Sequence, residues 1–324
     1  MKRILVIQTA FIGDVILATS LLETLKNEFP KAQLDFLVRR GNESLVDNHP
    51  FIHKVLIWDK KKAKYSSLWR LLLNIRSNRY DLVVNVQRFG ATGILSALSN
   101  AQYRTGFKKN PFAGFFTHKA HHQIGDGTHE IERNFELIRP FISEGTQPSR
   151  PQLYPSKQHF NAVESYSQNE FICVAPTSVW FTKQWPAEKW VDFINQVEQK
   201  LTIYLLGGPG DRSACENIKN QSKAQVINLA GKLSFLESAA LISKAKRSYV
   251  NDSGPLHISS AMNTPTTAVF CSTIPEFGFG PLSDHSKVVQ IEKPLDCRPC
   301  GLHGKKSCPE GHFKCAYLVD EKTL

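Results

Sequence analysis

Short apolar runs alternate along the whole chain with segments whose apolar positions recur every three or four residues. The first pattern predicts a buried β-strand and the second an amphipathic α-helix. In the first half, the predicted strands are residues 4–7, 34–38, 54–58, 81–86 and 102–107, and the predicted helices are residues 15–29, 66–75, 90–99 and 129–138. Strands that alternate with helices are typical of βαβ units and a parallel sheet.

The second half repeats this rhythm. Its predicted strands are residues 171–175, 201–206, 226–229, 248–250 and 266–270, and its predicted helices are residues 186–200, 212–220, 235–244 and a segment after 254. Residues 144–156 hold three prolines and a glycine and are predicted to be a linker. We therefore expect two α/β domains, residues 1–150 and 151–324, with a cleft at the carboxyl ends of their strands.

Two features of the first half do not follow the periodic pattern. Residues 108–127 are rich in Gly, Phe, Lys and His without a clear period, and a loop of that length is usually functional or mobile. The helix that follows is predicted to be capped by Thr128.

Composition is that of a globular protein, with 41% hydrophobic residues. No apolar run approaches the ~20 residues that a membrane-spanning helix requires. The first apolar run breaks at Gln8 and Thr9 and lacks a small-residue cleavage site, so it is interpreted as a strand and not a signal peptide. These features predict a cytoplasmic protein.

The positive charge is concentrated in the first half. The formal net charge is +11; residues 1–150 hold 22 Lys/Arg against 13 Asp/Glu, and residues 151–324 hold 18 against 16. Such a balance suits an anionic partner: a nucleic acid, an anionic lipid surface or a phosphorylated substrate. Solvated lysines on exposed helices would account for part of it.

The turn at residues 252–257 is the strongest local candidate for a binding site. Asp252, Ser253 and Gly254 follow a predicted strand, and Pro255 suits the first turn of a helix. Free backbone N–H groups and the positive end of the helix dipole would then attract a phosphate, to which His257 adds a donor. An ordinary helix cap explains the same residues equally well.

Two further loops are expected at the same edge of the second sheet. Residues 176–183 combine hydroxyl groups, among them that of Ser178, with Lys183, which suits a phosphate. Residues 207–211 are rich in glycine, and Asp211 could accept hydrogen bonds from ribose hydroxyls. Each loop is a weak signal alone, but together they predict a pocket for a nucleoside diphosphate.

Asp14 follows the first predicted strand and admits two interpretations. It caps its helix or acts as a general base, and a helix N-terminus would lower its pKa and weaken it as a base. The loop from Gln8 to Asp14 lacks the Gly-x-Gly-x-x-Gly pattern, which argues against a nicotinamide dehydrogenase. Neither a Walker A motif nor a Gly-x-Ser-x-Gly nucleophile elbow is present.

Three linked motifs resemble the lipopolysaccharide heptosyltransferases of glycosyltransferase family 9, in order and spacing and over nearly the whole chain. They are residues 12–17 (Ile-Gly-Asp-Val-Ile-Leu), residues 183–186 (Lys-Gln-Trp-Pro) and residues 251–254 (Asn-Asp-Ser-Gly) with His257. The resemblance implies a GT-B fold, in which two Rossmann-like, doubly wound domains face a central cleft. It also implies an inverting reaction that needs no metal and no other cofactor.

The resemblance assigns a role to each matched position. Asp14 matches the proposed catalytic base, and Lys183 matches a lysine on the donor diphosphate, with Ser178 nearby. Asp252, Ser253, Gly254 and His257 match the donor-phosphate turn, and Asp211 lies near an acidic contact to the nucleoside. Ser253 stands where threonine is common in the family, and Leu233 stands where some members have methionine.

By resemblance, the predicted reaction transfers heptose from ADP-heptose to a lipopolysaccharide inner-core acceptor. The alternatives are a GT-B transferase that uses another nucleotide sugar, or a non-catalytic nucleotide-binding module. The resemblance implies an anionic acceptor at the cytoplasmic face of the inner membrane, peripheral membrane contact and no nucleic-acid partner. Basic residues are expected to steer this acceptor: residues 60–64, Arg88, Arg104, Lys108 and Lys109.

Four of the seven cysteines cluster near the C-terminus, at Cys297, Cys300, Cys308 and Cys315. A CxxC pair followed by two more cysteines is compatible with a structural zinc site. Similar cysteine runs occur in heptosyltransferase II-like members, whose catalysis needs no metal. Reduced thiols and a redox-labile disulfide therefore remain open alternatives.

Overall fold

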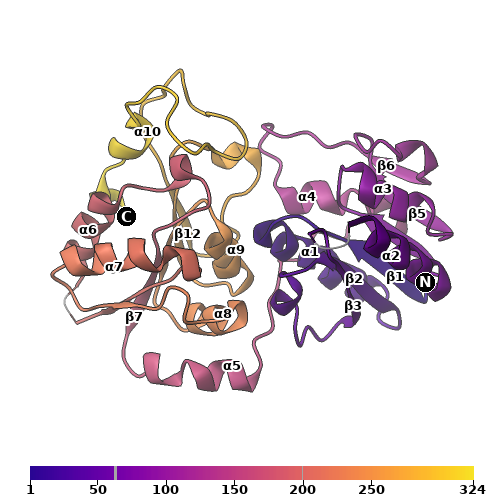
Figure 1. The fold of residues 1–324 in the computed structure, drawn as a ribbon, viewed down its shortest axis with the longest axis horizontal. Helices are drawn as coiled ribbons and strands as arrows, with labels where there is room; N and C mark the ends of the chain where they lie inside the picture. The colour runs from indigo at the N-terminus through magenta and orange to yellow at the C-terminus, as the bar shows by residue number, and fades with distance from the viewer. Residues whose placement is uncertain (62–63, 199) are drawn as a thin grey trace. The chain divides into compact units, whose positions relative to one another are not determined.

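The computed structural model describes residues 1–61, 64–198 and 200–324, and the chain divides into two compact units, Met1–Tyr154 and Pro155–Leu324 (Figure 1). Each unit is an α/β structure built on one six-stranded sheet, and every pairing between the described strands is parallel. The predicted fold class, two doubly wound Rossmann-like domains, is confirmed.

Unit 1 alternates strands and helices from its first residues. Its strands are β1 (Arg3–Ile7), β2 (Gln33–Arg39), β3 (Ile52–Trp58), β4 (Leu82–Asn85), β5 (Tyr103–Phe107) and β6 (His118–Ala120). Its helices are α1 (Ile12–Glu28), α2 (Lys64–Asn78), α3 (Gly90–Ala97) and α4 (Glu130–Phe135). Helix α1 is buried all round from Val15 to Leu25, as expected for a helix that is covered on every side.

Unit 2 repeats the alternation. Its strands are β7 (Phe171–Ala175), β8 (Thr202–Leu205), β9 (Val226–Asn228), β10 (Ser248–Asn251), β11 (Thr266–Val269) and β12 (Ser286–Val289). Its helices are α5 (Lys157–Ala162), α6 (Ala187–Gln196), α7 (Arg212–Gln221), α8 (Phe235–Ser243), α9 (Gly254–Ala261) and α10 (Lys314–Tyr317). Trp185 and Trp190 are its largest fully buried side chains and pack edge to face at 5.0 Å.

Both sheets have the same strand order. Unit 1 runs β3-β2-β1-β4-β5-β6, and unit 2 runs β12-β11-β10-β7-β8-β9, which is the same order read from the other edge. In each sheet the order reverses between the first and the fourth strand of the unit. Open parallel sheets bind their ligands outside the carboxyl ends of these two strands. The loops after β1 and β4, and those after β7 and β10, are therefore where a site is expected.

Strands β6 and β12 and the short helices α5 and α10 are absent from the sequence prediction, and helix α4 differs from it. Both of these strands are short edge strands with few buried residues. Strand β6 lies inside the segment 108–127 that was predicted to be a loop. Helix α4 is shorter than predicted, and its N-cap is His129 and not Thr128, because His129 Nδ1 accepts the N–H of Ile131 at 3.3 Å.

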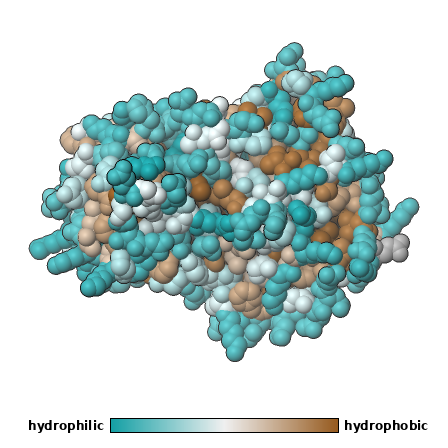
Figure 2. Space-filling model, turned by 180° about the vertical axis from the view of Figure 1, so that it is seen from behind, coloured by the Kyte–Doolittle hydropathy of each residue, from teal (hydrophilic) through white to brown (hydrophobic). Residues whose placement is uncertain are grey.

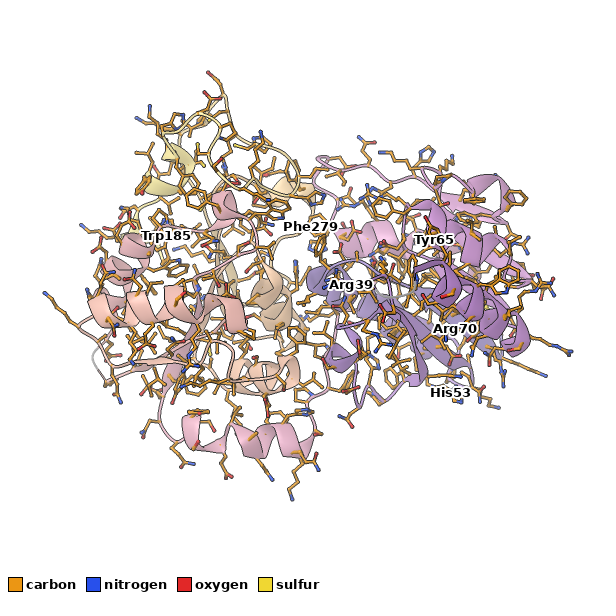
Figure 3. The ribbon with its side chains drawn as sticks, in the orientation of Figure 1. Arg39, His53, Tyr65, Arg70, Trp185 and Phe279 are labelled. Atoms are coloured by element: carbon orange, nitrogen blue, oxygen red, sulfur yellow. The ribbon has the colours of Figure 1, made fainter. Side chains whose placement is uncertain are left out.

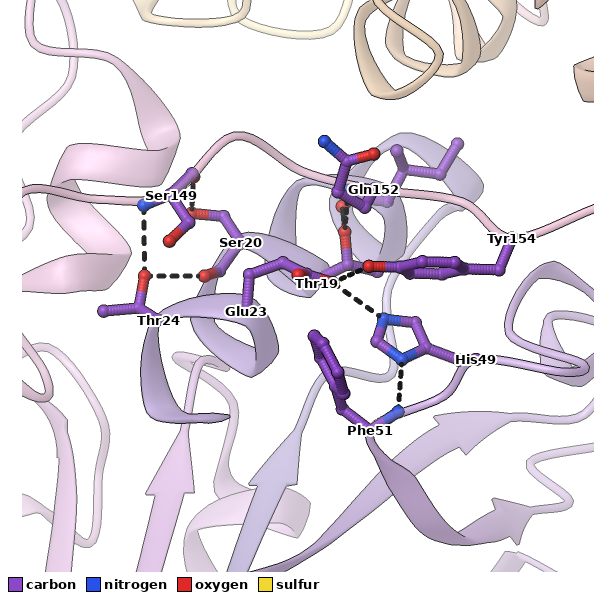
Figure 4. A network of polar contacts seen from close by, with 10 residues as sticks. Thr19, Ser20, Glu23, Thr24, His49, Phe51, Ser149, Gln152 and Tyr154 are labelled. Atoms are coloured by element: carbon purple, nitrogen blue, oxygen red, sulfur yellow. Dashed lines mark hydrogen bonds and ion pairs between the residues drawn. The ribbon is translucent and has the colours of Figure 1, made fainter. Parts of the chain in front are cut away.

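The predicted linker is bonded to helix α1 over its second half (Figure 4). The hydroxyl of Ser20 donates to the carbonyl of Ser149 at 2.6 Å, and the N–H of Gln152 donates to Thr19 Oγ1 at 2.9 Å. The hydroxyl of Tyr154 donates to Glu23 Oε1 at 2.9 Å. Residues 149–154 are therefore a structural part of unit 1.

The surface shown in Figure 2 is covered mainly by hydrophilic residues, between which smaller apolar patches are exposed. Among the described residues, no helix combines the length and the apolar character that crossing a bilayer requires.

Candidate active site

In unit 2, an ion pair joins the two loops at the point where the strand order reverses. Lys183 ends the 3-10 helix Phe181–Lys183 in the loop after β7, and Asp252 directly follows β10. Lys183 Nζ lies 2.7 Å from Asp252 Oδ2, and the same carboxylate oxygen accepts the hydroxyl of Thr273 at 2.6 Å. Both charged side chains are largely buried, so the pair holds the lysine in one place.

Asn251 makes a second connection between the same loops. Its Oδ1 accepts the N–H of Trp185 at 3.0 Å, and its Nδ2 donates to the carbonyl of Ala175 at 3.4 Å. The residue is fully buried, where an amide without partners would be costly. The motif at residues 183–186 and the motif at residues 251–254 are thus two halves of one local structure.

The strand-to-helix turn after β10 is present as predicted, with Ser253 as the N-cap of α9 and Pro255 in its first turn. His257 lies in the first turn of α9, is buried, and packs edge to face against Phe279 at 6.4 Å. One expectation is wrong: the backbone N–H of Asp252 is not free, because it donates to the carbonyl of Val269 at 3.2 Å.

The groups at this turn whose charge suits an anion therefore differ from those expected. The carboxylate of Asp252 would repel a phosphate, and it contacts Lys183 instead. The groups with suitable charge are the lysine ammonium and the N-terminus of α9 at Ser253 and Gly254.

The other two predicted donor contacts lie in neighbouring loops of unit 2. Ser178 is partly exposed in the loop after β7, and its carbonyl accepts Nε2 of Gln184 at 2.8 Å. Asp211 ends the 3-10 helix Pro209–Asp211 after β8, and its Oδ2 accepts the N–H of Gly208 at 2.8 Å. The contact shapes the glycine-rich turn, and the roles of both residues toward a ligand remain predictions.

The C-terminal segment contacts this site, which was not predicted. The guanidinium of Arg298 donates to the carbonyls of Cys271 at 2.6 Å and Thr273 at 2.7 Å, directly beyond β11. The N–H of Lys305 donates to Thr182 Oγ1 at 2.7 Å. Residues 298–305 are thereby fixed against the loop that carries Lys183. Arg298, which stands between Cys297 and Cys300, is the sequence feature that could have indicated this contact.

Gly304 lies closest to the lysine. Its φ is +75°, and a Cβ on it would come within 2.9 Å of Lys183 Cγ and 3.1 Å of Trp180 Cβ. The stem of Lys183 is therefore packed against a backbone position that only glycine fills without displacing the side chain.

All seven cysteines are free thiols. Cys297 Sγ lies 4.0 Å from His312 Nε2, and Cys300 Sγ lies 3.2 Å from the carbonyl of Cys297. Across residues 1–61, 64–198 and 200–324, no group of three or more His, Cys, Asp and Glu side chains is arranged to hold a metal ion. Burial raises the pKa of Cys315 to about 12, so this thiol is protonated.

In unit 1, Asp14 lies in the first turn of α1 beside the reversal of the strand order. It is not the N-cap, which is Phe11; Asp14 Oδ2 accepts the N–H of Phe11 at 3.1 Å. Burial, followed by the negative charge of Glu130, raises its pKa to about 6, against the opposing effects of backbone N–H groups and Arg88. The backbone N–H groups at the helix start do lower this pKa, as expected, but desolvation outweighs them and the net direction is upward.

Glu130 belongs to a buried charged cluster on α4, which packs against α1. Glu130 Oε2 lies 2.8 Å from Arg133 Nη2 and 3.6 Å from His122 Nε2. Burial alone would raise its pKa, but the contacts with His122 and Arg133 outweigh burial and hold the pKa of Glu130 below its usual range. A permanent negative charge is thereby maintained near Asp14, and sequence reasoning missed it.

The basic residues expected to steer an acceptor do not all lie at the carboxyl ends of the strands. Lys60 Nζ donates to the carbonyl of Thr9 at 2.7 Å, and Lys108 and Lys109 directly follow β5. Arg104 lies near the amino end of β5 and binds the carbonyls of Phe115 and Ala101 at 3.0 and 2.6 Å, so it is not at the carboxyl edge. Residues 62 and 63 and the side chain of residue 64 lie outside the described structure.

A cavity of about 290 Å³ lies at the amino ends of the strands of the second sheet. Ile172, Phe193, Tyr249 and Leu324 are among the residues that line it. Ile172 and Tyr249 are near the amino ends of β7 and β10. Because ligands of open parallel sheets bind at the carboxyl ends, the candidate site remains with Lys183 and α9.

The fold is that of a two-domain α/β protein in which a largely buried lysine of one loop lies beside the turn that begins α9. The sequence profile of glycosyltransferase family 9 (heptosyltransferase) matches residues 68–311, more than half of the 324 residues. The chain belongs to this family, as predicted, and is a glycosyltransferase.

Individual relatives agree with this assignment. Lipopolysaccharide heptosyltransferase 3 of Escherichia coli is 28% identical over 278 residues, which cover 81% of this chain and 82% of the relative. The structure of the family 9 glycosyl transferase from Veillonella parvula superposes with a TM-score of 0.87 at 20% identity, covering 99% of this chain and 94% of the other. The structure of E. coli ADP-heptose LPS heptosyltransferase II gives 0.77 at 23% identity, with 93% and 96% coverage. These likenesses support the GT-B fold.

Proposed function

We propose that the protein transfers heptose from ADP-heptose to an inner-core acceptor of lipopolysaccharide, with inversion at the anomeric carbon. Family membership provides the reaction class, and the names of the similar heptosyltransferases suggest the sugar and the acceptor. The observation that carries the proposal is the buried pair of Lys183 and Asp252 beside the N-terminus of α9.

Unit 2 is the proposed donor domain. Lys183 neutralises the diphosphate, and the N–H groups at Ser253 and Gly254 donate to it at the positive end of α9. Asp252 orients Lys183 and does not itself touch the phosphate. His257 supports the turn from within α9, while Ser178 and Asp211 are proposed contacts to the diphosphate and the ribose.

Unit 1 is the proposed acceptor domain, with Asp14 as the general base. A pKa of about 6 leaves Asp14 largely ionised at neutral pH, yet keeps it more basic than an ordinary carboxylate. An acceptor hydroxyl forms a bond to the anomeric carbon while the bond from that carbon to the ADP oxygen breaks. The hydroxyl proton passes to Asp14, and ADP leaves with the electron pair, stabilised by Lys183 and α9.

The acceptor is an anionic glycolipid in this proposal, so the protein would work as a peripheral protein at the cytoplasmic face of the inner membrane. The excess of basic residues in unit 1, including Lys60, Lys108 and Lys109, supports an anionic acceptor there.

The test combines binding and turnover. Thermal shift with ADP-, UDP- and GDP-sugars should select the ADP-sugar, and mass spectrometry should detect heptose on a heptose-deficient lipopolysaccharide core. Asp14→Ala is expected to abolish transfer while retaining ADP binding. Stabilisation by a UDP- or GDP-sugar alone would favour another donor. Binding without transfer or donor hydrolysis would favour a non-catalytic module, and normal turnover by Asp14→Ala would reject the proposed base.

A further inference from the structure

Helix α2 presents large apolar side chains on both of its sides. Its inner side contributes to the core of unit 1 through Leu71, Leu72 and Ile75. On its outer side, Tyr65 is 78% exposed, Trp69 60% and Leu73 51%. Residues four apart lie above one another on a helix, so these three form one continuous row on the surface. Single exposed apolar residues are normal, but a row that includes tryptophan and tyrosine marks an interaction surface.

The segment that carries the row is rich in basic residues, and two exposed arginines lie on the same helix. Residues 60–78 contain six Lys/Arg and no Asp or Glu. Arg70 and Arg76 are exposed on α2 itself, and Tyr65 and Arg70 are marked on this helix in Figure 3. Arg76 Nη1 lies 3.4 Å from the carbonyl of Leu98, whose exposed side chain adjoins the far end of the helix. The outer side of α2 is therefore both apolar and cationic.

We propose that the outer side of α2, defined by Tyr65, Trp69, Leu73, Arg70 and Arg76, docks the protein on an anionic lipid bilayer. Tryptophan and tyrosine rings are favoured at the level of the lipid headgroups, where one end of the ring is apolar and the other is wet. The leucine reaches the acyl boundary, and the arginines interact with anionic headgroups. Helix α2 lies in the plane of the interface and does not cross it.

The docking helix begins next to the loop that leads to Asp14. The side chain of Ser67 donates to the carbonyl of Asp59 at 3.0 Å, which fixes the start of α2 to the end of the β3 loop. Lys60 of that loop donates to the carbonyl of Thr9, between β1 and α1. A bilayer under α2 would therefore hold a lipid-linked acceptor close to the carboxyl ends of the strands in unit 1. Docking through α2 specifies the membrane contact proposed above, and only its role in presenting the acceptor rests on the proposed function.

Charge favours a lipid surface over a second copy of the chain. Two copies joined through this side would bring their cationic residues together without an acidic residue from the same segment to neutralise them. An anionic bilayer neutralises all of them at once.

The full-length protein should be tested by flotation with vesicles of phosphatidylcholine alone and of phosphatidylcholine with about one third phosphatidylglycerol. The wild type is expected to float with the anionic vesicles. Trp69→Ser with Leu73→Ser should lower the bound fraction at least about tenfold, since two of the anchors are lost. Arg70→Gln with Arg76→Gln should lower binding to anionic vesicles and weaken its dependence on salt.

Leu318→Ser is the matched control, because Leu318 is 61% exposed but belongs to unit 2. This variant should bind vesicles like the wild type. Transfer to a water-soluble acceptor fragment should be unchanged in the α2 variants, which separates docking from catalysis. Failure of the wild type to float, or wild-type flotation by the Trp69/Leu73 variant, would overturn the proposal. So would a wild-type dimer in light scattering that the same variant converts to a monomer, because the row would then be a self-contact.

Discussion

Lys183 Nζ and Asp252 Oδ2 are 2.7 Å apart, although the two residues come from loops that follow different strands of the second sheet. A lysine side chain is flexible, and fixing it before a ligand arrives removes part of the entropic cost of binding. The carboxylate also offsets the cost of holding a buried ammonium. In the proposed site Asp252 would act on a bound anion only through Lys183, and this role distinguishes two substitutions that would otherwise look equivalent.

Lys183→Ala is expected to weaken ADP binding by roughly 10- to 100-fold, because a charge-assisted hydrogen bond to the diphosphate is lost. Asp252→Asn should weaken it by less than about tenfold, since the lysine remains but is no longer oriented. Titration calorimetry with ADP measures both. Lys189→Ala removes another lysine–carboxylate pair of 2.8 Å, to Glu321, and should leave ADP binding unchanged.

The order of the two effects is the critical outcome. If Asp252→Asn were as damaging as Lys183→Ala, Asp252 would have to contact the nucleotide itself, and the orienting role would be wrong.

Gly304→Ala should raise the dissociation constant for ADP several-fold, because its new Cβ would displace the stem of Lys183. Gly311→Ala provides the matched control: its φ is +68°, close to the +75° of Gly304, and nothing lies within 4 Å of the added Cβ. Both variants bear the same strain of a left-handed backbone, about 1 kcal/mol. A difference in ADP affinity between them therefore reports the contacts of the added Cβ with Lys183 and its loop neighbours Thr182 and Trp180. Equal affinities would show that the C-terminal segment does not position the lysine.

The sequence allowed the alternating pattern of both units to be predicted because their central strands are continuous apolar runs. Strands β6 and β12 were missed because edge strands bury little: His118–Ala120 contains one buried residue, and Ser286–Val289 begins with two exposed ones. Their place is determined by pairing with β5 and β11, and pairing across the chain is not visible in local periodicity.

Only part of the candidate site was predicted, because its other contacts join segments far apart in the sequence. The turn at α9 and Lys183 were visible as local motifs. The contact of Asp252 with Lys183, and the packing of Gly304 on that lysine, depend on segments far apart in sequence. The net rise in the pKa of Asp14 was not predicted, because burial and the charge of Glu130, on a helix packed against α1, depend on tertiary contacts.

Glu130→Gln should move the acid limb of the kcat/KM profile to lower pH by roughly one unit, because a negative charge that raises the pKa of Asp14 is removed. Arg133 would lose its ion pair with Glu130, which lowers the pKa of Asp14 further and costs stability of about 3 kcal/mol. Glu130→Asp keeps the charge and should largely restore the profile.

Glu136→Gln is the control for that shift. Glu136 pairs with Arg139 at 2.7 Å with the same spacing of three residues, but both side chains are about half exposed. Its pH profile should match the wild type. If Glu130→Gln did not shift the acid limb of the kcat/KM profile, Glu130 would not act on the group that titrates there.

Asp14→Asn is expected to remove activity and at the same time stabilise the fold at alkaline pH. The carboxyl has a pKa of about 6 in the folded protein against an ordinary value of 3.8, so between these values the native state holds more protons than the unfolded one. Wild-type stability should therefore fall as pH rises through this window, by about 1–2 kcal/mol after allowance for partial exposure. The asparagine carries no charge to desolvate, and its Oδ1 can still accept the N–H of Phe11.

Urea unfolding at pH 4 and pH 8 would measure this difference. At pH 8 the variant should be the more stable protein, and near pH 4 the two curves should converge. Asp126→Asn serves as the opposite control, because the N–H of Thr128 holds the pKa of that exposed carboxyl below its usual range, so neutralising it should give no gain at pH 8. A loss of stability in Asp14→Asn at pH 8 would identify the carboxylate as a stabilising cap. A gain would show that its position costs folding energy, as expected when a carboxylate is kept basic for proton transfer.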